Sequence, residues 1–88
     1  MLGSKSWTIG GLKITFNGYT SHGTIAYGMS KGLSASQIKT ILSNGTPRIV
    51  TNARWRNQLF VNFQGKAIVI DISNGANHGK IITYLLNP

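Results

Sequence analysis

The architecture follows from one stretch of the chain, Lys66-Ala67-Ile68-Val69-Ile70-Asp71-Ile72. The stretch is rich in β-branched residues, which favour strands, and it is apolar at odd and even positions alike. Side chains of a strand alternate between its two faces, so both faces of this strand have to be buried. The stretch therefore predicts a strand in the middle of a sheet.

Further strands are predicted on both sides of this stretch. Arg48–Asn52 and Gln58–Phe63 precede it, and Lys80–Leu86 follows it. The short turn Gln64-Gly65 and the polar loop Ser73–Gly79 separate these runs, as turns separate the strands of a meander. The second half of the chain therefore predicts an antiparallel meander of about four strands.

A helix is predicted just before the strands, at residues 35–43. Ser34-Ala35-Ser36-Gln37 matches the capping box, in which the Ser34 hydroxyl accepts the Gln37 N–H and the Gln37 side chain reaches back. Asn44-Gly45 predicts a left-handed end to this helix. Its buried face is predicted to hold Ile38, Ile41 and Leu42.

A shorter helix is predicted from His22 to about Lys31-Gly32, capped by Thr20-Ser21. Its spacing predicts one buried face with His22, Ile25, Ala26 and Met29. Before it, Trp7–Ile9 and Leu12–Phe16 flank Gly10-Gly11, a pattern typical of a tight hairpin.

The 88 residues fit a single domain. The expected order is a hairpin in residues 1–19, a helical region in 20–45 and a β-meander in 47–86. The predicted fold class is α+β, with one or two short N-terminal helices packed on a four- to five-stranded antiparallel sheet.

The charge balance points to a polyanionic partner. The chain has nine Lys and Arg residues and one acidic residue, Asp71, and its net charge is +8 at pH 7. A field of one sign costs stability through self-repulsion, so a polyanion is the economical explanation. Nucleic acid is the first candidate, an acidic protein the second and an anionic membrane surface the third. No apolar run approaches the roughly 20 residues of a membrane-spanning helix.

The composition excludes several kinds of active site. Without cysteine there is no thiolate nucleophile, disulfide or cysteine-bound zinc. With a single carboxylate, paired-carboxylate catalysis is impossible. His22, His78 and Asp71 make a poor set of metal ligands, and neither a metal nor another cofactor is predicted.

The remaining side chains suit RNA cleavage without a metal. Attack of a 2′-hydroxyl on its own phosphate needs a base, a cation for the phosphate and a donor for the leaving oxygen. The candidates are His22 and His78 for proton transfer, Lys31, Arg54 and Arg56 for the phosphate, and Thr83 and Tyr84 for orientation. Because side chains that are neighbours on a strand point to opposite faces, either Thr83 or Tyr84 can be an ordinary packing residue. Each histidine also has a plain alternative, His22 at the edge of the core and His78 exposed in its loop.

Arg54-Trp55-Arg56 is the sharpest basic cluster. Guanidinium groups grip phosphates and an indole stacks on an unpaired base, whereas the alternative is a core Trp55 between solubilising arginines. Arg48, Lys66 and Lys80 are further cations predicted to bind nucleic acid. Asp71 is expected to pair with a Lys or Arg, since a lone buried carboxylate is costly.

The order of several short motifs resembles toxin domains of the Barnase–EndoU–Colicin–RelE superfamily, which includes the C-terminal toxins of contact-dependent growth inhibition proteins. The motifs are Ser21-His22, Lys31-Gly32-Leu33-Ser34, Gln37-Ile38, Ile41-Leu42-Ser43-Asn44-Gly45, the stretch from Lys66 to Ile72, and Gly79-Lys80-Ile81-Ile82-Thr83-Tyr84. The resemblance places His22 on the histidine at the helix start and Thr83 on the threonine of the last strand. Because the chain has no Glu, it resembles the Lys/Arg/His version of the active site.

This resemblance implies a metal-independent endoribonuclease that cleaves tRNA in the cleft of the sheet and leaves a 2′,3′-cyclic phosphate. It also implies an acidic immunity protein as partner, delivery as part of a larger secreted effector, and action in the cytoplasm of a target cell. Two other hypotheses stay open on the sequence alone. One is a non-catalytic RNA-binding module that uses Arg54, Trp55 and a basic face, and the other is a module whose sole partner is an acidic protein.

Overall fold

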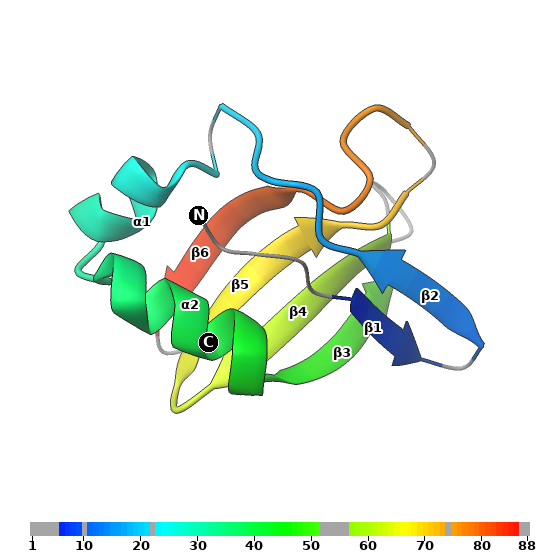
Figure 1. Ribbon diagram of the computed structural model, residues 1–88, viewed down its shortest axis with the longest axis horizontal. Helices are drawn as coiled ribbons and strands as arrows, with labels where there is room; N and C mark the ends of the chain where they lie inside the picture. The colour runs from blue at the N-terminus through cyan, green and yellow to red at the C-terminus, as the bar shows by residue number, and fades with distance from the viewer. Residues whose placement is uncertain (1–5, 10, 22, 52–56, 74, 87–88) are drawn as a thin grey trace.

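The computed structural model describes residues 6–9, 11–21, 23–51, 57–73 and 75–86. Its elements, in chain order, are β1 (Ser6–Ile9), β2 (Leu12–Thr15), α1 (Ile25–Ser30), α2 (Ala35–Asn44), β3 (Thr46–Thr51), β4 (Asn57–Phe63), β5 (Lys66–Asp71) and β6 (Ile81–Leu86). Figure 1 shows a twisted sheet of β3 to β6, with α2 and the β1–β2 hairpin in front of it. The predicted α+β class is confirmed.

The four-stranded sheet is an antiparallel meander in the order β3-β4-β5-β6. The strand β5 has a neighbour on each side, and its residues from Ala67 to Asp71 are all buried, as the apolar stretch predicts. Gln64 and Gly65 form the turn between β4 and β5 with φ angles of 49° and 79°. Positive φ at both positions matches the twist of a tight hairpin, and glycine adopts it without steric cost.

One face of the sheet holds the hydrophobic core. The helix α2 packs on β4 and β5, and its predicted buried residues Ile38, Ile41 and Leu42 are 0%, 1% and 3% exposed. The capping box of α2 is formed, with the Gln37 N–H donating to Ser34 Oγ at 3.1 Å. The core residues on the four-stranded sheet are Leu59, Val61, Ile68, Ile70, Ile81 and Tyr84.

The end of α2 differs from the prediction. Gly45 has a φ of −67°, so it is not in the left-handed conformation. A Cβ atom at this position would lie 2.5 Å from the Ile41 carbonyl oxygen and 2.6 Å from Val61 Cγ1. The close approach of the chain to the helix end and to β4, rather than backbone conformation, therefore requires glycine here.

The helix α1 begins at Ile25, so the prediction that it starts at His22 is wrong. The Oγ1 atom of Thr24 caps it by accepting the Tyr27 N–H at 3.2 Å, whereas Thr20 Oγ1 accepts the Gly23 N–H in a separate turn. Both segments have a capping residue, and the sequence did not reveal which one starts the helix. The predicted buried face is also wrong, because Met29 is 54% exposed and Ala26 is exposed too.

The predicted N-terminal hairpin is confirmed, with Trp7 paired to Ile14. Both side chains are buried and belong to the core cluster, so the hairpin extends the layer that covers the sheet. No helix in the described parts of the chain is long and apolar enough to cross a membrane.

Candidate nucleic-acid interface

The sheet has a second face, which points away from the helices and the hairpin. Along each strand, core residues such as Leu59 and Ile70 alternate with residues whose side chains lie on this second face. We call it the open sheet face. It consists of Thr46, Arg48, Val50, Gln58, Phe60, Asn62, Ala67, Val69, Asp71, Thr83 and Leu85. No described helix or additional strand packs on it. Its residues on β3, β4 and β6 are half-buried or exposed, whereas Ala67, Val69 and Asp71 on the central strand β5 are buried.

One row of this face combines a cation, an aromatic ring and a hydroxyl. Arg48 pairs with Phe60, Phe60 with Val69 and Val69 with Thr83, so the row crosses all four strands. Strands lie about 4.8 Å apart, and the row is therefore about 14 Å long. An exposed guanidinium can hold a phosphate and an aromatic ring can stack on a base, so the row has the groups that bind single-stranded nucleic acid.

His78 lies in the loop between β5 and β6, and its side chain is half-buried. Its Nδ1 atom is 3.1 Å from the Ser73 carbonyl oxygen, and its backbone N–H donates to Gly75. This loop starts just beyond Asp71. Asp71 is two residues along β5 from Val69, which belongs to the row on the open sheet face. His78 is therefore in a loop at one end of this face, and its ring is held by a hydrogen bond.

Of the two neighbours predicted to orient RNA, only Thr83 lies on the open sheet face. Tyr84 points to the other side, where it is 0% exposed in the core. Its hydroxyl donates to the Gly23 carbonyl oxygen at 2.9 Å, and burial, with a smaller effect of Tyr19, raises its pKa to about 12. Tyr84 is therefore a packing residue, and the orienting role can belong to Thr83 alone.

Lys31 and Arg48, two of the cations predicted to act on RNA, lie at opposite edges of the sheet. Lys31 follows α1, which packs on β6, and its Nζ atom lies 5.3 Å from the centre of the Tyr27 ring. Arg48 is on β3, at the opposite edge of the sheet and on its open face. The connection between α1 and α2 is also far from the β5–β6 loop, so Lys31 and His78 are not brought together (Figure 1).

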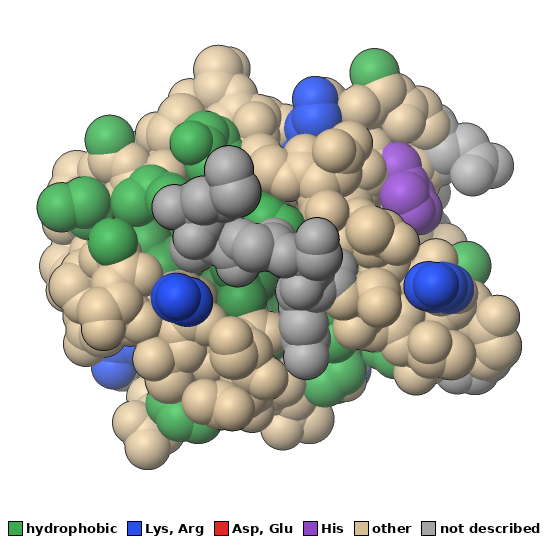
Figure 2. Space-filling view, in the orientation of Figure 1, with side chains coloured by type: hydrophobic (Ala, Val, Ile, Leu, Met, Phe, Trp, Pro, Cys, Tyr) green, Lys and Arg blue, Asp and Glu red, His purple; other side chains and the backbone are tan. Residues whose placement is uncertain are grey.

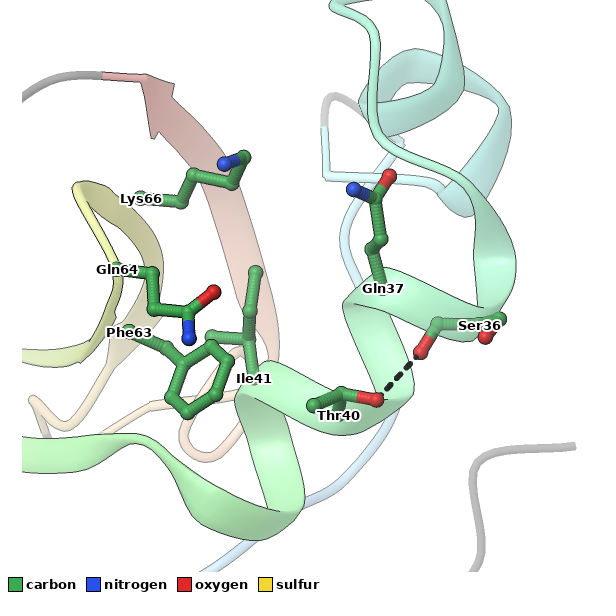
Figure 3. Close-up of a pocket in the computed structure, with 7 residues that line it drawn as sticks. All are labelled: Ser36, Gln37, Thr40, Ile41, Phe63, Gln64 and Lys66. Atoms are coloured by element: carbon green, nitrogen blue, oxygen red, sulfur yellow. Dashed lines mark hydrogen bonds between the residues drawn. The ribbon is translucent and has the colours of Figure 1, made fainter.

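Lys66 also lies apart from the open sheet face. Side chains alternate along β5, so Lys66 lies on the same side of the sheet as Ile68 and Ile70, where α2 packs. There it lines a cavity of about 180 Å³ between α2 and the β4–β5 turn. Figure 3 shows the Lys66 side chain extending from the β4–β5 turn into this cavity, with the Phe63 ring among the groups that line it.

The described cations are spread over the surface. On the helix-covered side, Figure 2 shows separate Lys and Arg side chains with no acidic side chain among them. Lys80 is half-buried at the base of the β5–β6 loop, where its carbonyl oxygen accepts the Asp71 N–H at 3.0 Å. Among the described residues, no group of three or more His, Cys, Asp or Glu side chains is placed to hold a metal ion.

Four predicted site residues lie outside the described residues: His22, Arg54, Trp55 and Arg56. Their roles stay predictions. Thr51 ends β3 and Asn57 begins β4, on either side of Arg54, Trp55 and Arg56 in the sequence. Thr51 and Asn57 pair with each other at the same end of the sheet as Asp71. The Asn57 carbonyl oxygen also accepts the N–H of Ile72 at 3.3 Å, where the His78 loop begins.

Comparison with known proteins leaves the family open. No protein-family model, curated protein or solved structure matches this chain. The resemblance to the toxin superfamily therefore stays a hypothesis.

Phe60 is not among the binding residues predicted from the sequence. A signal for it is present, because Leu59 and Val61 share one face of β4 by alternation, which leaves Phe60 on the other face. A large aromatic side chain between the polar residues Gln58 and Asn62, on a sheet face that none of the described helices covers, is a feature of base-stacking surfaces. Only the register shows that it lies beside Arg48.

Proposed function

We propose that this chain is the toxin domain of a metal-independent endoribonuclease, of the type found in the Barnase–EndoU–Colicin–RelE superfamily, and that its substrate is tRNA. The observation that carries the proposal is the row from Arg48 through Phe60 to Thr83 on the open sheet face, beside the loop of His78. The net charge of +8, with one acidic residue in the chain, supports a polyanionic substrate.

The proposed reaction is attack of a ribose 2′-hydroxyl on the adjacent phosphorus. The proton of that hydroxyl passes to the imidazole of His78 or His22, and the 5′-oxygen leaves with a proton from a second donor. The bond from phosphorus to the 5′-oxygen breaks as the new bond to the 2′-oxygen forms, which gives a 2′,3′-cyclic phosphate. Arg48, with Arg54 and Arg56, stabilises the charge on the phosphate, and Phe60 stacks on a neighbouring base.

The same resemblance supports the proposed partners and setting. A nuclease toxin needs an inhibitor in the cell that makes it, and an acidic immunity protein would complement the charge of +8. The domain would be delivered as part of a larger secreted effector and would act in the cytoplasm of a target cell.

The test is incubation of the purified protein with total tRNA in the presence of EDTA. We expect discrete fragments that end in a 2′,3′-cyclic phosphate. His22→Ala and His78→Ala should each lower the cleavage rate by about 100-fold if that residue transfers a proton. Lys39→Ala is the control, since Lys39 is exposed on α2, on the covered side of the sheet. Intact tRNA at high enzyme concentration would refute the nuclease proposal.

A non-catalytic RNA-binding module is the second candidate. It is favoured by the open sheet face itself, because Arg48 and Phe60 serve binding without any proton transfer. In that case tRNA stays intact and shifts in a gel, and the affinity falls steeply as the salt concentration rises.

A further inference from the structure

Asp71 is the one acidic residue of the chain, and it is buried, with 4% of its surface exposed. A carboxylate in such a place needs hydrogen-bond donors, because burial without them is costly. The backbone N–H of Ser73 donates to Asp71 Oδ1 at 2.8 Å, and the Ser73 hydroxyl donates to the same oxygen. Asp71 therefore fixes both the backbone and the side chain of Ser73.

Ser73 in turn holds the ring of His78. The carbonyl oxygen of Ser73 lies 3.1 Å from His78 Nδ1. A carbonyl oxygen can only accept a hydrogen bond, so His78 Nδ1 has to carry the proton of this contact. A neutral imidazole has one ring proton, and this one leaves Nε2 as the basic nitrogen.

The base of the loop is closed by the backbone of the same aspartate. The Asp71 N–H donates to the Lys80 carbonyl oxygen at 3.0 Å, and the Gly79 N–H donates to the Asp71 carbonyl oxygen at 2.7 Å. His78 is adjacent to Gly79, and its own N–H donates to Gly75 at 3.2 Å. Asp71 thus binds the loop on both sides of His78, through Ser73 before it and through Gly79 and Lys80 after it.

We propose that Asp71 is a positioning residue for His78, which it holds through Ser73 in the tautomer with the proton on Nδ1. Nε2 is then the nitrogen that accepts a proton from a ligand, and the imidazolium that forms keeps its bond to the Ser73 carbonyl. Metal-bound and catalytic histidines are oriented in the same way, by a fixed acceptor for the second ring nitrogen. The role of Nε2 as a base for RNA rests on the proposed function, whereas the tautomer does not.

The test is the ¹⁵N spectrum of the histidine side chains at a pH where the rings are neutral. In the wild-type chain we expect His78 to show a protonated Nδ1 and an unprotonated Nε2. Asp71→Ala removes the acceptor for Ser73 and should shift the ratio of the two tautomers by about tenfold toward protonated Nε2, the effect of about one hydrogen bond. Asp71→Asn keeps an acceptor oxygen and should restore the wild-type tautomer.

Asn77→Ala is the matched control, because Asn77 is exposed in the same loop and the substitution keeps its backbone carbonyl, which accepts from the Lys80 N–H. Its spectrum should equal that of the wild type. A wild-type His78 with its proton on Nε2 would overturn the proposal, whether or not Asp71→Ala folds. So would a folded Asp71→Ala chain with an unchanged tautomer.

The cleavage assay separates this inference from the proposed function. If tRNA stays intact and His78 has the expected tautomer, the nuclease proposal is refuted and the positioning role of Asp71 is supported. If tRNA is cleaved and His78 is protonated on Nε2, the nuclease proposal is supported and the positioning role is refuted. Where both hold, Asp71→Ala should lower kcat more than it raises KM, since it disturbs a proton acceptor and leaves Arg48 and Phe60 in place.

Discussion

The hydroxyl of Tyr84 donates a hydrogen bond of 2.9 Å to the carbonyl oxygen of Gly23. The two residues are 61 positions apart in the chain, and the bond is buried. It ties β6 to the segment that leads into α1, where Gly28 faces the same ring. The tyrosine that the sequence offered for catalysis is thus part of the contact that fixes α1 on the sheet.

We expect Tyr84→Phe to destabilise the fold without reducing function. The substitution keeps the ring and leaves the Gly23 carbonyl oxygen without this donor, which should lower the free energy of unfolding by about 1 to 2 kcal/mol. Urea denaturation measures this change. At a temperature where both proteins are folded, RNA binding and cleavage should equal those of the wild type. A large loss of cleavage in a stably folded variant would return Tyr84 to the list of site residues.

The same burial predicts a loss of stability at alkaline pH. Burial raises the pKa of Tyr84 from 10.0 to about 12, so the folded state keeps a proton that the unfolded state loses. The contribution of Tyr84 to stability is therefore constant below about pH 10 and falls as the pH rises from about 10 to 12, by up to about 2 to 3 kcal/mol. Denaturation midpoints across this range measure the fall, and Tyr84→Phe should show a smaller one. Equal slopes for the two proteins would contradict the prediction.

Local rules predicted most of the fold. The capping box at Ser34 and the apolar stretch around Ile68 each specify an element by themselves, and both are formed. The start of α1 could not be read in this way, because Thr20 and Thr24 both cap a turn. Gly45 was misread for a related reason, since its need for glycine comes from contact with Val61, a residue of β4.

The candidate site was harder to predict, because it depends on how the strands are paired. Arg48 and Thr83 are 35 positions apart, and only the register across β4 and β5 places them in one row. Charge alone does not show which side of the sheet a residue faces. Lys66 starts the most strongly predicted strand, yet it points to the side covered by α2.

Phe60 is expected to contribute to RNA affinity. Loss of base stacking costs about 1 to 3 kcal/mol, so Phe60→Ala should weaken binding of single-stranded RNA by about tenfold or more. Tyr19→Ala is the control, because Tyr19 is an exposed aromatic residue outside the open sheet face. Fluorescence anisotropy with a labelled oligonucleotide compares the two. If both variants bind like the wild type, the open sheet face is not the binding surface.

Gly45→Ala tests whether the close approach at the end of α2 fixes the helix on the sheet. An added Cβ would meet the backbone oxygen of Ile41 and the Val61 side chain at distances that real structures do not contain. Relief requires the backbone at the end of α2 to change, because the Ile41 oxygen belongs to the same helix, and it requires this end to move away from Val61 on β4. We expect a cost of about 2 to 3 kcal/mol. Gly32→Ala is the comparison, since its Cβ would meet nothing within 4 Å and the cost comes only from a φ of +100°, about 1 kcal/mol. Thermal denaturation should rank the variants with Gly45→Ala the less stable. The reverse order would mean that α2 can move away from the sheet at little cost, and the packing of Ile41 on the core would then be looser than described.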